Sequence, residues 1–237
     1  MTRTTTARVA GFTFLFYIVV GITSLVLSGR AIRGDAIAAK LASVAQHTTE
    51  VRVLAALYLL TAFSAVVLGV TLYAITREQD RDLAMVALTC RVVEGINNAQ
   101  AVPGTLALLW LATTSRANAL DAGATQALGG YLLRGDGISA IFFAVASTLF
   151  SWLLLRGRII PIPLAWLGVL ASALVVVILS LQLLGLFVTA GSWSSTVTWL
   201  MWFPLLVFEV TLALWLLIKG VATPAPMSGA GKAPFLH

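Results

Sequence analysis

Six long runs of apolar residues divide the chain, and a shorter, more polar segment separates each run from the next. The runs are 18 to 29 residues long, whereas about 20 helical residues cross the hydrocarbon core of a bilayer. A transmembrane β-barrel would instead show alternating segments of about 10 residues. The pattern therefore predicts an all-α polytopic membrane bundle of six transmembrane helices. The predicted spans are Val9–Leu27, Val53–Ile75, Leu83–Leu111, Ile138–Leu155, Pro161–Val188 and Val197–Ile218.

The segment after the first span has a helical pattern of its own. Within residues 35–46, Ile37, Leu41 and Val44 recur at helical spacing and would form one apolar stripe. Such a stripe on a short, otherwise polar helix favours a position flat in the membrane interface. We therefore expect a short interfacial amphipathic helix here, within a transmembrane domain that covers residues 1–222. The Pro/Gly-rich residues 223–237 are predicted to be a disordered cytoplasmic tail.

Two further details concern the third span and the segment that follows it. Asp82 precedes the apolar run and is a predicted N-cap, because its carboxylate can accept a hydrogen bond from a free backbone N–H. Residues 116–134 are long and semi-polar and predict a surface helix that breaks at Gly129–Gly130.

The composition supports the membrane assignment. Of the 237 residues, 59% are hydrophobic and only 10% are charged, whereas soluble domains average about 25% charged residues. The mean hydropathy is +0.98. Eight Lys and Arg residues flank the side of the bundle that would carry both termini, against six on the other side. Because positive charge is enriched in cytoplasmic loops, we predict a multi-pass protein of the cell membrane with both termini cytoplasmic.

The residue counts disfavour most site chemistry. With one cysteine and two histidines, the chain offers no disulfide and too few ligands for a metal centre, and we predict no metal, no cofactor and no catalytic residues. The net charge of +6 comes from scattered cations, whereas nucleic-acid binding needs a contiguous basic face. The predicted partners are therefore the lipid bilayer and a small-molecule or lipid ligand, and no nucleic acid.

Three ionisable residues lie deep within predicted spans: Arg91 and Glu94 in the third, and Glu209 in the sixth. At 1.5 Å per residue they lie ~12, ~16 and ~13 Å from the cytoplasmic ends of these spans. They therefore occupy one layer. A charge at this depth costs several kcal/mol, so each should face protein or water and should have a partner.

Other polar residues should reach the same layer. Asn98 shares the helix face of Arg91 and Glu94, while Tyr17 in the first span and Ser147 in the fourth lie at similar depth. The sequence thus predicts a polar core of Arg91, Glu94, Asn98, Glu209 and Tyr17 as a candidate binding site. One arginine cannot neutralise two carboxylates. We expect Arg91 to pair with Glu209, whose helix faces it, and Glu94 to be the carboxylate that more readily takes up a proton.

Two functions remain open on the sequence. The polar core could bind or move a small solute, a proton or a lipid. Alternatively, the protein is a non-catalytic accessory or scaffold subunit in which the charged core only fixes the register of the helices. An intramembrane enzyme is disfavoured because the spans contain no His, no paired Asp and a single Cys, Cys90.

Several motifs together resemble a known family. They are ARVAGFTFLFYIVVGI near the start, CRVVEGINN in the third span, WLLLRGRIIPIPLAWLGVL across the fourth and fifth, and FPLLVFEVTLALWLLIKG at the end. Over residues 7–220 the chain resembles the bacterial family called domain of unknown function 4386. The resemblance implies a six-helix membrane protein without an assigned activity. The positions that match the signature of the family are Arg91, Glu94, Glu209, Trp215, Lys219 and Gly220.

Overall fold

The structure is a computed structural model that describes residues 2–114, 121–134, 137–186 and 192–221, with side chains described from residue 200 in the last range. Within these ranges the chain forms eight α-helices and no strands, which confirms the all-α prediction. The predicted tail lies outside the described residues. The helices are α1 (Arg3–Ala31), α2 (Ile37–Gln46), α3 (Thr48–Thr76), α4 (Arg81–Thr113), α5 (Ala122–Leu132), α6 (Ile138–Arg156), α7 (Ile162–Leu183) and α8 (Ser192–Ile218).

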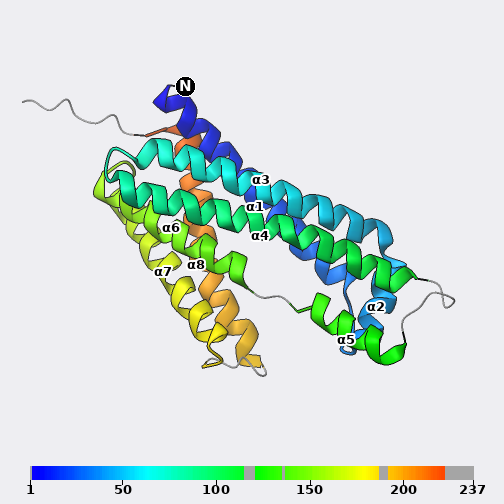
Figure 1. Cartoon of the computed structure of the whole chain (residues 1–237). Coiled ribbons are helices and arrows are strands. Elements are labelled where there is room, and N and C mark those ends of the chain that lie inside the picture. Colours follow the sequence, from blue (N-terminus) through cyan, green and yellow to red (C-terminus); the bar gives the residue numbers. More distant parts are fainter. Residues whose placement is uncertain (1, 115–120, 135–136, 187–191, 222–237) are drawn as a thin grey trace, which may run out of the picture.

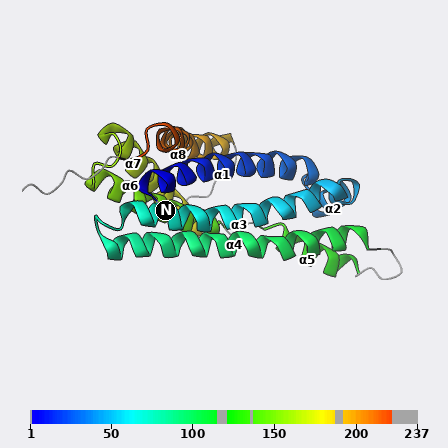
Figure 2. The ribbon, with the colours of Figure 1, turned by 90° about the horizontal axis from the view of Figure 1, so that it is seen from above.

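Six long helices form a closed ring, and each packs mainly against two neighbours. The order around the ring is α1, α3, α4, α6, α7 and α8, and α8 returns to α1. Figure 1 shows α6, α7 and α8 diverging from α1, α3 and α4 towards the end of the bundle that carries α2 and α5. Figure 2 shows α1, α3 and α4 running alongside one another. We call the end with the N-terminus the inner end and the end with α2 and α5 the outer end.

Five of these helices are long and apolar enough to cross a membrane, so the chain is a multi-pass membrane protein. They are α1, α3, α6, α7 and the Leu200–Ile218 part of α8. The third predicted span is α4, a single helix of 33 residues, but it is not among the five. Its polar segment from Arg91 to Gln100 lowers its hydropathy. The sixth span therefore stays a prediction.

Two helix boundaries differ from the prediction for identifiable reasons. The fifth predicted span extends to Val188, yet α7 ends at Leu183 because Gly185 adopts a positive φ of 71°. The N–H groups of Gly185 and Leu186 then bond back to the carbonyls of Gln182 and Leu181, which is the Schellman arrangement. The N-cap of α4 is also not the predicted Asp82.

Asp80 is the N-cap of α4. Its Oδ1 accepts the backbone N–H of Leu83 at 3.0 Å, which places Asp82 within the first turn. The same residue joins two helices at the inner end, because Oδ2 of Asp80 lies 3.3 Å from Nη1 of Arg156 at the end of α6. A second inner-end ion pair joins Arg3 to Glu78 at 2.7 Å. Both pairs are solvent-exposed and contribute little individually.

At the outer end, α2 and α5 cover the ring helices. Leu41 and Val44, from the predicted amphipathic stripe, are buried in a small core with residues of α3 and α4. The stripe therefore packs against protein, and a position in the membrane interface stays a prediction. The predicted break at Gly129–Gly130 is wrong, because α5 continues through both glycines. A Cβ on Gly129 would lie 3.0 Å from Ile37, so the glycine lets α5 approach α2 closely.

Candidate functional site

Arg91 and Glu94 form a buried ion pair on the inward face of α4. Their side chains are 1% exposed, and Nη1 of Arg91 donates to Oε2 of Glu94 at 3.0 Å. The spacing of three residues places both groups on one face of the helix. Because both side chains are buried, their pairing neutralises two charges that would otherwise be very costly to bury.

Two further hydrogen bonds extend the pair to neighbouring helices. The hydroxyl of Tyr17 on α1 donates to Oε1 of Glu94 at 2.6 Å, and Nη2 of Arg91 donates to Oγ of Ser147 on α6 at 2.9 Å. Phe143 lies beneath the guanidinium, with its ring centroid 4.7 Å from Cζ, and stacks on Tyr17. We call Arg91, Glu94, Tyr17 and Ser147 the polar clamp, because together they connect α1, α4 and α6.

A glycine on α3 makes room for the arginine of the clamp. A Cβ on Gly69 would lie 2.8 Å from Cβ of Arg91 and 3.0 Å from Cδ1 of Leu88. The backbone of α3 therefore passes directly against the stem of Arg91. In membranes, where lipid competes equally for apolar contact, such small residues are what allow two helices to pack tightly.

Replacing this glycine gives a test of the α3–α4 contact. We expect Gly69→Ala to lower the free energy of unfolding by about 1–3 kcal/mol through overpacking. The matched control is Gly21→Ala, because nothing lies within 4 Å of the added methyl group. The control should be neutral or stabilising by up to about 1 kcal/mol, since alanine favours helix more than glycine does. Detergent unfolding curves measure both, and equal effects would contradict the contact.

Glu209 on α8 does not join the clamp, so the predicted Arg91–Glu209 ion pair is wrong. Glu209 is 5% exposed and close enough to Arg91 and Glu94 for their charges to interact. However, its Oε1 has no hydrogen-bond partner among the described residues. The physical reason is proximity: Glu94, three residues along the same helix, pairs with Nη1 of Arg91, and Ser147 accepts from Nη2. Nε of Arg91 is buried without a hydrogen-bond partner among the described residues. Glu94, which we expected to be left without a cation, is the carboxylate that pairs with Arg91.

Asn98, the fifth residue predicted for the polar core, lies elsewhere. It lines a cavity of about 680 Å³ in the outer half of the bundle, together with the neighbouring Asn97. Asn97 has a buried Nδ2 without a hydrogen-bond partner among the described residues. Neither Arg91 nor Glu94 lines this cavity. Of the five predicted residues, three therefore lie in the clamp, Asn98 lines a cavity about one turn farther along α4, and Glu209 belongs to neither.

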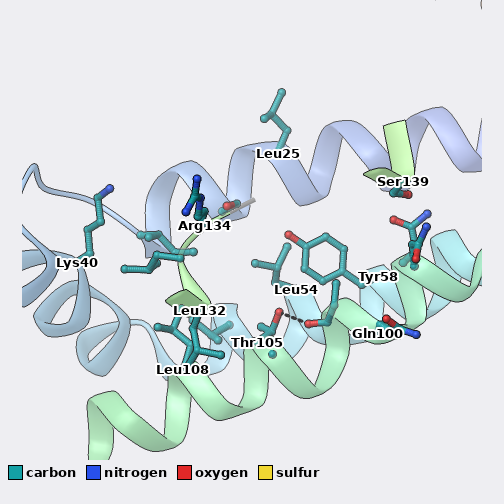
Figure 3. Close-up of a pocket in the computed structure, with 18 of the residues that line it drawn as sticks. Leu25, Lys40, Leu54, Tyr58, Gln100, Thr105, Leu108, Leu132, Arg134 and Ser139 are labelled. Atoms are coloured by element: carbon teal, nitrogen blue, oxygen red, sulfur yellow. Dashed lines mark hydrogen bonds between the residues drawn. The ribbon is translucent and has the colours of Figure 1, made fainter. Parts of the chain in front are cut away.

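Residues from six helices, α1 to α6, and from the segment between α5 and α6 line the outer cavity. In Figure 3, Lys40 and Arg134 lie at one side of the view, Gln100 and Ser139 at the other, and Leu54 and Tyr58 between them. Apolar side chains, including Leu25, Leu108 and Leu132, form much of the wall. No carboxylate is among the lining residues that the structure describes. The cavity is thus partly apolar, rich in hydrogen-bonding groups and positive in charge.

The sequence reasoning missed Lys40, Arg134 and Tyr58 as site residues. Lys40 is on α2, Arg134 follows α5, and Tyr58 is on α3, so no single periodic pattern connects them. Only Lys40 and Arg134 could have been considered from the sequence, because these cations lie in the polar segments between predicted spans. Among the described residues, no group of three or more His, Cys, Asp or Glu could hold a metal ion.

The sequence profile of one family, described as a domain of unknown function (DUF4386), matches residues 9–220. The chain therefore belongs to this family, as the resemblance of its motifs indicated. No curated protein and no solved structure matches it.

Proposed function

We propose that this member of the DUF4386 family is a six-span protein of the cell membrane that binds an amphiphilic anion in the outer cavity without transforming it. The observation that carries the proposal is the lining of the cavity, where Lys40 and Arg134 meet apolar walls and no described carboxylate. The buried amide of Asn97 adds a hydrogen-bond donor that has no partner in the described part of the chain. A volume of about 680 Å³ lies within the roughly 300–1,000 Å³ usual for small-molecule sites.

The proposal treats α4 as the sixth span. The helix has 33 residues and lies between α3 and α6, both of which are apolar enough to cross the membrane. Its charged residues Arg91 and Glu94 face the ring interior and are buried, so they do not meet lipid. A helix that buries its polar face in a bundle can cross a membrane at low overall hydropathy.

An even number of spans places both termini on one side, and the inner end, with its Arg-rich segments, is proposed to be cytoplasmic. In a Cys90→Ala background, Thr114→Cys at the outer end should react with a membrane-impermeant maleimide added to intact cells. Gln79→Cys at the inner end should react only after the membrane is opened. Labelling of both positions from outside, or the reverse pattern, would contradict the topology.

The polar clamp has a different role in this proposal. Arg91 and Glu94 do not line the outer cavity and pair with each other, and Tyr17 and Ser147 connect them to α1 and α6. These contacts favour the second function considered from the sequence, a charged core that fixes helix register, for the clamp itself. The clamp then provides the rigid base on which the outer halves of α1, α4 and α6 form the cavity.

Titration with a simple amphiphilic anion, dodecyl phosphate, tests the binding function. We expect saturable binding to the purified protein in a nonionic detergent, followed by the fluorescence of its tryptophans. Lys40→Gln should weaken binding about tenfold, since one charge-assisted hydrogen bond contributes about 1.5–3 kcal/mol. The matched control is Arg30→Gln, which removes an exposed cation of the outer end that does not line the cavity. If both variants lose the same affinity, the effect comes from general surface charge, and the proposal is contradicted.

A further inference from the structure

A second cavity lies beside the first one at the outer end of the bundle. Its volume is about 440 Å³, and it lies between the outer halves of α6 and α7. Its wall is mainly apolar, with Ile138 and Ile141 from α6 and Leu179 and Leu183 from α7. Its polar lining groups are the amide of Gln182 and the guanidinium of Arg134.

Arg134 lines both cavities. The residue follows the last turn of α5 and is exposed, so it lies at the border of the two cavities. An anionic group that binds there would have a partly apolar cavity on the side of α1, α3 and α4 and a mainly apolar cavity on the side of α6 and α7. A guanidinium is also well suited to a phosphate, since it can donate two parallel hydrogen bonds.

From this arrangement we infer that the ligand is an anionic phospholipid with two acyl chains, whose phosphate binds Arg134 and whose chains divide between the two cavities. The inference rests on the proposed function, because it identifies the class of the amphiphilic anion. Lys40, which lines only the larger cavity, supplies the second cation for the headgroup. An amphiphile with a single chain would leave the apolar wall of one of the two cavities without an acyl chain against it.

The test compares one-chain and two-chain lipids on the full-length protein in nonionic detergent. The probes are dioleoyl phosphatidylglycerol, its one-chain lyso form, and dioleoyl phosphatidylcholine as the lipid without net charge. Native mass spectrometry and tryptophan fluorescence report binding. We expect the two-chain anionic lipid to bind most tightly, and Arg134→Gln to weaken both anionic lipids about tenfold or more.

Leu179→Trp isolates the smaller cavity, because the larger side chain fills it without altering charge. This variant should lose its preference for the two-chain lipid and should keep the affinity of the lyso form. The matched control is Leu174→Trp, on the same helix but exposed and outside the lining, and it should keep both affinities. If Leu179→Trp fails to fold, Ile141→Trp fills the same cavity from α6.

Each alternative outcome is decisive. If the filled variants bind both anionic lipids as the wild type does, or lose both equally, the smaller cavity does not hold a chain and the inference is overturned, while the proposed function stands. Equal binding of phosphatidylcholine would overturn the role of the anionic headgroup. If the wild type binds neither anionic lipid nor dodecyl phosphate, the proposed function itself fails.

Discussion

Glu94→Leu should lower the free energy of unfolding by roughly 3–5 kcal/mol, because it strands the guanidinium of Arg91 in a layer without water. Arg91 is 1% exposed and its ion pair within the described residues is with Glu94. The substitution also removes the acceptor of the Tyr17 hydroxyl, which bonds to Glu94 at 2.6 Å. The change therefore removes the ion pair and the polar link between α1 and α4, and leaves only the bond of Arg91 to Ser147.

The double variant Arg91→Leu/Glu94→Leu should be more stable than Glu94→Leu alone. Removing both charges leaves no unpaired ion, and apolar replacements of a buried ion pair are often neutral. Glu209→Leu serves as the matched carboxylate control on α8, and it should cost less than Glu94→Leu because Oε1 of Glu209 has no described partner to lose. Thermal unfolding in detergent compares the four proteins. A larger loss for Glu209→Leu would show that Arg91 pairs with Glu209 after all.

Phe208→Ala should also cost about 3–5 kcal/mol, through the cavity left between α7 and α8. Phe208 is 2% exposed, and its ring lies directly against Gly168, where the absence of a side chain accommodates it. Lipid cannot refill this enclosed space, so the packing energy is lost. The Phe208 ring is thus one of the apolar contacts that hold α7 against α8.

The matched control for this prediction is Phe203→Ala on the same helix. Phe203 is 60% exposed, so lipid or detergent replaces its contacts, and the loss should stay within about 0.5 kcal/mol. Unfolding curves in the same detergent measure both variants. Similar losses at Phe203 and Phe208 would contradict the packing of Phe208 on Gly168.

The fold was predictable from the sequence to the level of helices and membrane location. Apolar runs of spanning length specify helices because backbone groups within a bilayer must bond inside their own segment. The same logic located Arg91 and Glu94 on one face of α4 and Tyr17 and Ser147 at their depth, since helical rise and phase are fixed by backbone geometry. The ends were less predictable: the N-cap Asp80 and the Schellman turn at Gly185 depend on which of several candidate residues adopts the required backbone conformation.

The partner of Arg91 was not predictable, because spacing along one helix says nothing about how neighbouring helices rotate. Glu209 lies at the predicted depth but does not bind Arg91. The terminal nitrogens of Arg91 donate instead to Glu94 and Ser147. The outer cavity was equally hidden, since Lys40, Tyr58 and Arg134 come from three separate elements.

By itself, then, the sequence determined that this protein is helical, is embedded in a membrane and buries a layer of charged residues. These properties follow from local hydropathy and helical periodicity. Only the tertiary structure decided which charges pair, that the ring of helices opens towards its outer end, and that two cavities meet at Arg134. Those features depend on how helices that are distant in the chain rotate and diverge. Small residues such as Gly69 and Gly168 allow such helices to pack closely, but their presence in the sequence does not indicate which helices will meet.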